Sequence, residues 1–107
     1  MVDLPLEEST TFGLHTRIPD PDYARDLVAL VEETGMTTLA VGDHLAFAQP
    51  IDDSLMGLAM VATLSKKITI ATSVYLLPLR HPGLVAKQTN TLARMAPGRF
   101  IFGVGVG

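Results

Sequence analysis

The stretch that decides the fold of this 107-residue chain is Ile68-Thr69-Ile70-Ala71-Thr72-Ser73-Val74. Apolar and β-branched residues fill most of it, as is typical of a strand buried on both faces of a parallel sheet. Three comparable runs accompany it, with starts about 26 to 32 residues apart: Thr11–His15, Thr37–Gly42 and Phe100–Val106. A helical pattern fills each gap, which is the spacing of successive βα units. The sequence therefore predicts an α/β fold with four parallel strands.

Each gap also carries a signal for the start of its helix. Asp20 and Pro21 suit the cap and the first position of a helix whose apolar residues form one stripe. The second helix is predicted to start at Asp53 or Ser54, and the third at His81-Pro82. The connections before these two helices, which we expect at 43–53 and 75–80, are long for βα loops, and such loops are often functional.

The sequence alone leaves two parallel topologies open. Strict alternation of strands and helices fits the N-terminal half of a TIM-type (β/α)8 barrel, and it also fits part of a doubly wound nucleotide-binding sheet. A complete barrel needs roughly 250 residues, so we expect this chain to supply about half of one. Residues 1–10 are predicted to be a polar lead-in, and residues 11–107 a partial barrel domain.

Composition excludes several classes of function. The formal net charge is −3, and Lys66-Lys67 is the only adjacent basic pair, so the sequence does not favour nucleic-acid binding. No apolar run approaches the roughly 18 residues of a membrane span, and the first residues do not resemble a secretory signal. The absence of cysteine excludes disulfides and thiolate metal sites. We therefore expect a cytoplasmic protein that acts on a small-molecule substrate.

The candidate site residues follow the predicted strands. In a parallel βα barrel, active-site residues gather at the C-terminal ends of the strands. Asp43 and His44 follow the second strand, where a histidine can hold or move a proton and an aspartate can bind a ligand. Small Ser73, with Val74, ends the third strand, and His15 ends the first, where it is a candidate for lining the substrate pocket. The alternative is that all five are ordinary capping, strand-end and loop residues.

Glycines alternate through the last predicted strand, Gly103-Val104-Gly105-Val106-Gly107. A dinucleotide-binding loop requires GxGxxG between a strand and a helix, and no helix follows here. Glycines on one face of a strand make room for a ligand or for tight packing. We expect Arg80, ahead of the third helix, to be solvated, and the three histidines are too widely spaced for a metal site.

Three motifs together resemble the luciferase-like monooxygenases, which are flavin-dependent, and their deazaflavin-dependent relatives. The resemblance covers about residues 11–107 in the right order. Its motifs are Leu39-Ala40-Val41-Gly42-Asp43-His44-Leu45, Ile70-Ala71-Thr72-Ser73-Val74-Tyr75-Leu76-Leu77-Pro78-Leu79-Arg80-His81-Pro82, and Ala86-Lys87-Gln88 with Gly98-Arg99-Phe100-Ile101-Phe102-Gly103-Val104-Gly105-Val106-Gly107.

The resemblance implies a barrel with a flavin or deazaflavin ring over the C-terminal ends of the strands. In the family, a bulge after the third strand often contains a non-proline cis peptide that supports the ring, and this position maps onto Ser73-Val74. The second-strand pair maps onto Asp43 and His44, as catalytic and cofactor-binding residues. Gly105 and Gly107 would border the ring.

The resemblance also implies an oxidoreductase, with FMN or coenzyme F-420 as cofactor. In the FMN version, a partner reductase supplies reduced flavin for oxygenation of the substrate. In the F-420 version, the cofactor exchanges a hydride with the substrate while His44 handles the proton. Asp43 and His44, together with Ser73 and Val74, favour the F-420 branch.

Typical members of the family are about three times longer, so the resemblance implies an N-terminal fragment. Barrel phosphate sites usually come from the loops after strands seven and eight, and we therefore expect little or no turnover from the 107 residues alone. The alternative hypothesis is a non-catalytic relative that acts through oligomeric assembly, in which paired half-barrels bury each other's edges. A homo-oligomer is expected in either case.

Overall fold

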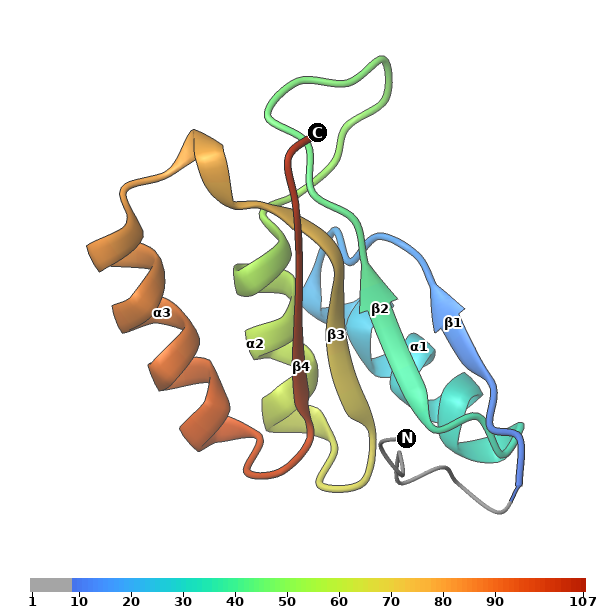
Figure 1. Cartoon of the computed structure of the whole chain (residues 1–107). Coiled ribbons are helices and arrows are strands. Elements are labelled where there is room, and N and C mark those ends of the chain that lie inside the picture. The colour runs from blue at the N-terminus through green and yellow to red at the C-terminus, as the bar shows by residue number, and fades with distance from the viewer. Residues whose placement is uncertain (1–8) are drawn as a thin grey trace.

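A computed structural model describes residues 9–107, so that most of the predicted lead-in at residues 1–10 lies outside the described residues. Four strands and three helices alternate along the chain (Figure 1). Their bounds are β1 Gly13–His15, α1 Pro21–Glu33, β2 Thr38–Val41, α2 Ser54–Leu64, β3 Thr69–Leu76, α3 Pro82–Met95 and β4 Phe100–Gly105, with a 3-10 turn at Leu77–Leu79.

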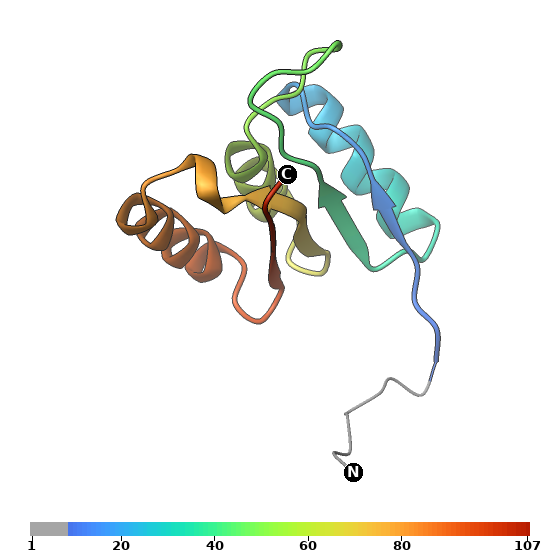
Figure 2. The same cartoon turned by 45° about the horizontal axis from the view of Figure 1, so that its top comes forward.

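The four strands form one parallel sheet in the order β1-β2-β3-β4. A doubly wound sheet reverses its strand order at a switch point, whereas a barrel adds each strand next to the previous one. The helices follow one another along one side of this sheet (Figure 2). The sequential order therefore decides between the two topologies left open by the sequence, in favour of part of a barrel: three βα units and a fourth strand.

The helix starts agree with the predicted caps. Asp20 accepts a hydrogen bond from the Tyr23 amide at 2.8 Å, and Asp53 accepts one from the Met56 amide at 3.0 Å. The ring of His81 accepts the Gly83 amide at the start of α3. Each side chain satisfies one of the amides that a first helical turn leaves without a partner.

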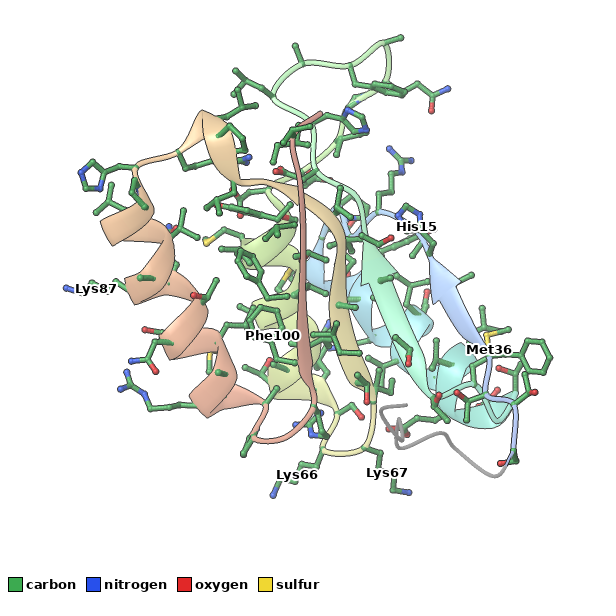
Figure 3. All side chains as sticks on the ribbon, in the orientation of Figure 1. His15, Met36, Lys66, Lys67, Lys87 and Phe100 are labelled. Carbon is green, nitrogen blue, oxygen red and sulfur yellow. The ribbon has the colours of Figure 1, made fainter. Side chains whose placement is uncertain are left out.

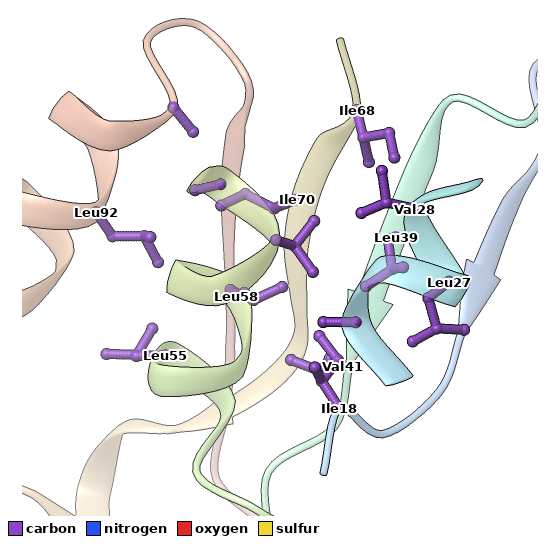
Figure 4. Close-up of a cluster of buried hydrophobic side chains, with 14 of the residues drawn as sticks. Ile18, Leu27, Val28, Leu39, Val41, Leu55, Leu58, Ile68, Ile70 and Leu92 are labelled. Atoms are coloured by element: carbon purple, nitrogen blue, oxygen red, sulfur yellow. The ribbon is translucent and has the colours of Figure 1, made fainter. Parts of the chain in front are cut away.

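The core lies between the sheet and its helices (Figure 4). Alternate residues of β2, Leu39 and Val41, point into it, as do Leu58 of α2 and Ile70 of β3. Burial of such side chains contributes roughly 1.5–3 kcal/mol each. Because one face of every strand is committed to this core, the other face of the sheet and the strand ends remain available for a site.

One predicted boundary is wrong. The segment Tyr75–Arg80 was expected to be a loop, but β3 continues to Leu76 and a 3-10 turn follows at Leu77–Leu79. The pairing of β3 with β4 is interrupted between Thr72 and Tyr75 and then resumes. A bulge inserts extra residues without ending the strand, so it cannot be distinguished from a strand end by composition alone. None of the helices within residues 9–107 is long and apolar enough to cross a membrane.

Candidate functional site at the carboxyl ends of the strands

Contacts between side chains and backbone join the carboxyl ends of β1, β2 and β3. The Nε2 atom of His15, at the end of β1, lies 3.2 Å from the carbonyl oxygen of Ser73 in β3. Asp43, after β2, accepts a hydrogen bond of 2.8 Å from the Leu76 amide. Figure 3 shows His15 near the end of β1, well away from Lys66 and Lys67 at the opposite end of the sheet. Parallel strands place these residues at one edge, as the sequence predicted.

Asp43 and Arg80 form an ion pair at this edge. One Arg80 nitrogen donates to Oδ1 of Asp43 at 2.8 Å, and the other donates to Oδ2, so the contact is bidentate. Asp43 is 3% exposed and Arg80 is half-buried. The prediction that Arg80 is solvated is therefore wrong, because the planar guanidinium matches a carboxylate 37 residues away in the sequence.

The pair changes the protonation equilibria around it. Burial by itself raises the pKa of Asp43, but hydrogen bonds from Arg80 and Leu76, with the guanidinium charge, outweigh burial and lower the pKa. The hydrogen bonds to Asp43 raise the pKa of Arg80. The guanidinium also lies 4.4 Å from the centre of the Tyr75 ring, and burial raises the pKa of this tyrosine. Asp43 is therefore ionised at neutral pH.

The bulge in β3 forms an apolar floor. The peptide bond between Ser73 and Val74 is cis, which confirms the expectation drawn from the resemblance. A Cβ on Gly105 would lie 2.5 Å from Cγ2 of Val74, and a Cβ on Gly103 would lie 2.4 Å from the Thr72 carbonyl oxygen. Both positions therefore require glycine, because a larger side chain would collide with β3. Val74 of β3 packs over these glycines, on the side of β4 that faces away from the core. Val74 is 42% exposed there.

A cavity of about 260 Å³ lies between the loops that follow β1 and β2, and His15 links it to the Ser73 carbonyl. His15 and His44 both line it, with Arg17 from the first loop. His44 is exposed, and its ring lies 4.6 Å from the ring of Phe47, measured between centres. Ser54, at the start of α2, also lines the cavity, and its buried hydroxyl has no hydrogen-bond partner within the described residues.

The structure brings some of the predicted site residues into contact and leaves others apart. His15 contacts the Ser73 carbonyl, Val74 lies against Gly105, and His44 shares the cavity with His15. Within the described residues, Asp43 forms no hydrogen bond with any of these but binds Leu76, three positions after Ser73. Gly107 lies past the end of β4, with a positive φ of 104°.

Sequence reasoning missed the Arg80 partner of Asp43 and the lining residues Arg17 and Ser54. Arg80 was recognisable as a candidate for a carboxylate, but no signal in the sequence pairs it with Asp43. Within residues 9–107, no group of three or more His, Cys, Asp or Glu residues is arranged to hold a metal ion.

Comparison with known proteins places this arrangement in a family. The sequence model of the luciferase-like monooxygenases matches residues 6–107. An F420-dependent glucose-6-phosphate dehydrogenase of Nakamurella multipartita is 35% identical over 95 residues, covering 81% of this chain and 27% of the relative. A 2,5-diketocamphane 1,2-monooxygenase of Pseudomonas putida is 30% identical over 103 residues, covering 92% and 28%. The chain thus spans less than a third of these relatives.

Two solved structures share the fold at low sequence identity. The FMN complex of the oxygenating constituent of 3,6-diketocamphane monooxygenase from Pseudomonas putida aligns with a TM-score of 0.77 and 22% identity, over 92% of this chain and 30% of that one. The coenzyme F420-dependent tetrahydromethanopterin reductase of Methanopyrus kandleri aligns at 0.76 and 24%, over 91% and 27%. With its sequential parallel strands and the family match over residues 6–107, the chain belongs to the luciferase-like monooxygenase family.

Proposed function

We propose that this chain forms the part of an oxidoreductase that supports the ring of coenzyme F-420 or FMN. The observation that carries the proposal is Val74, exposed on the inner face of the sheet above Gly103 and Gly105. A flat apolar ring needs an apolar surface to lie on, and Val74 supplies one because the two glycines let it pack close to β4. The family membership and the names of the relatives support the choice of cofactor class.

The residues present fit such a ring. Val74 and the Ser73 backbone would support it from below, and Gly105 of β4 and Gly107, just past β4, would border it. Bound F-420 supplies hydride transfer, whereas bound reduced FMN supplies activation of oxygen. His44 stands in the cavity beside the floor and holds or moves a substrate proton there. His15 fixes the Ser73 carbonyl and lines the same cavity.

The substrate is a small organic molecule that enters the cavity lined by His15 and His44. We favour F-420 over FMN because five relatives of 32–38% identity are named F420-dependent glucose-6-phosphate dehydrogenases. In the FMN alternative, supported by the camphane monooxygenases, a flavin reductase is the partner. The exposed inner face and the two open sheet edges also favour self-association of the chain.

Fluorescence titration of the chain with F-420 and with FMN tests the proposal. We expect saturable binding, tighter for F-420, and loss of binding in Val74→Asp because a charge on the floor opposes an apolar ring. Leu84→Asp is the matched control, since Leu84 is also apolar and exposed, at 64% against 42% for Val74, but lies on α3. Tighter FMN binding would reverse the cofactor preference, and equal binding by the two variants would contradict the proposed floor.

A further inference from the structure

The ion pair at the end of β2 has a role that proton chemistry does not explain. We propose that Asp43 and Arg80 are positioning residues that clamp the β3 bulge in place, and that Asp43 takes no direct part in proton transfer. The bulge, Ser73-Val74, supports the floor of the proposed site, and Tyr75 and Leu76 follow it directly, so a clamp on Leu76 sets where that floor lies. Its consequence for cofactor binding depends on the proposed function, whereas its structural part does not.

Donors of the chain itself occupy the carboxylate of Asp43. Oδ1 of Asp43 receives Arg80, and Oδ2 receives both Arg80 and the Leu76 amide. A carboxylate offers about four acceptor positions, of which three are filled here by donors of the chain itself. With Asp43 only 3% exposed, a substrate has little access to what remains. His44, exposed in the cavity, is the better placed of the two for proton transfer.

The pair of Asp43 and Arg80 holds Leu76. Leu76 ends β3, and both of its backbone polar groups are bound: the amide by Asp43 and the carbonyl by Arg80 at 3.1 Å. Arg80 also lies over the ring of buried Tyr75, the residue before Leu76. Three contacts thus fix the C-terminal side of the bulge to the end of β2.

His15 contacts the bulge on its N-terminal side, at Ser73. The Ser73 carbonyl lies 3.2 Å from Nε2 of His15, which reaches across from β1. A Cβ at Gly42, between the two, would lie 3.5 Å from the histidine ring. The bulge is therefore contacted on both sides: His15 of β1 reaches the Ser73 carbonyl, and Asp43 after β2 holds Leu76, just beyond the interruption between Thr72 and Tyr75.

Hydrogen exchange of the Leu76 amide tests the clamp without any cofactor. In Arg80→Met and in Asp43→Asn, we expect the Leu76 amide to exchange roughly ten- to hundredfold faster, the factor given by loss of one charged hydrogen bond. The double variant should add little further, because both changes break one unit. Amides of Leu39 and Leu58, in the core, should keep their protection.

Arg25→Met is the matched control, since Arg25 pairs with Asp22 on the exposed face of α1. It should leave Leu76 exchange unchanged. Should Arg80→Met not fold, Arg80→Lys keeps the charge but loses the bidentate geometry, and it should still accelerate Leu76 exchange. Unchanged exchange in the folded Arg80 variant, or fully additive effects in the double variant, would overturn the clamp.

Titration with F-420 and FMN then separates positioning from direct contact. A positioning role predicts the same loss of affinity for Arg80→Met and Asp43→Asn. A loss confined to Asp43→Asn would make Asp43 a direct contact and overturn the assignment. If neither cofactor binds the unchanged chain, the proposed function fails, and the exchange experiment still decides the clamp.

Discussion

The chemistry of Asp43 is set by its partner. In water an aspartate can bind a proton or a cation, but here Arg80 and the Leu76 amide take up its oxygens and lower its pKa. The sequence identified Asp43 and His44 as a pair, whereas the structure separates them: Asp43 is buried and His44 is exposed. Adjacent residues on a strand end thus enter different environments, and only one of them reaches the cavity.

The lowered pKa predicts how acid affects stability. The unfolded chain protonates Asp43 near the ordinary aspartate pKa of about 3.9, whereas the folded chain keeps it ionised to lower pH. The contribution of Asp43 to the free energy of unfolding is therefore fully present above about pH 4 and is lost as the pH falls through the lowered pKa. Urea denaturation between about pH 7 and pH 2 measures it, with Asp43→Asn as the reference that lacks the titrating group.

Removal of the partner should reverse this dependence. In Arg80→Met, burial still raises the pKa of Asp43, but the hydrogen bond and the charge of Arg80 no longer oppose it, so we expect the pKa to rise. We expect the free energy of unfolding at pH 7 to fall by about 3 kcal/mol and to recover partly as the pH is lowered. Arg25→Met, at an exposed pair, should change stability by less than about 1 kcal/mol. An acid profile identical to that of the unchanged chain would contradict the buried pair.

Glycine packing under Val74 gives a second prediction at this scale. Gly105→Ala would place a Cβ 2.5 Å from Cγ2 of Val74, and overpacking of this kind costs about 1–3 kcal/mol. Adding Val74→Ala removes the colliding methyl group and should restore most of the loss. Gly103→Ala meets a backbone oxygen instead, so Val74→Ala should not rescue it. Thermal denaturation of the single and double variants distinguishes these outcomes.

At the scale of elements, local signals decide where helices begin. Asp20 caps α1 through the Tyr23 amide, and we expect Asp20→Ala to lower the free energy of unfolding by about 1 kcal/mol. Asp26→Ala, an exposed change of the same type inside α1, should have little effect. Equal melting temperatures for the two variants would contradict the cap.

The strands depend on more than local signals. The starts of all three helices were predicted correctly, and the four strands were located, but the end of β3 was misplaced because its pairing with β4 resumes after the bulge. Whether a residue after a bulge continues a strand depends on the neighbouring strand. Residues 70–72 and 75–76 pair with β4, which begins at Phe100, far from them in the sequence.

At the scale of the whole molecule, the sheet has two open edges, β1 and β4, and an inner face with exposed apolar residues such as Ile101 and Val74. Such edges and faces favour association. We expect the chain to sediment above its monomer mass at micromolar concentration, and Ile101→Lys to reduce this association. Leu30→Lys, on the outer face of α1, is the control. A compact monomer for the unchanged chain in analytical ultracentrifugation would contradict the prediction.

The sequence by itself determined the order of the elements, the helix caps and the positions of His15, Asp43 and His44 at strand ends, because periodicity and capping are local properties. It could not decide between a barrel and a doubly wound sheet, since both have the same alternation. Tertiary structure alone decided the strand order, the pairing of Asp43 with Arg80 and the contact of His15 with Ser73. These join residues 37 and 58 positions apart, where the geometry of the folded sheet selects the partner.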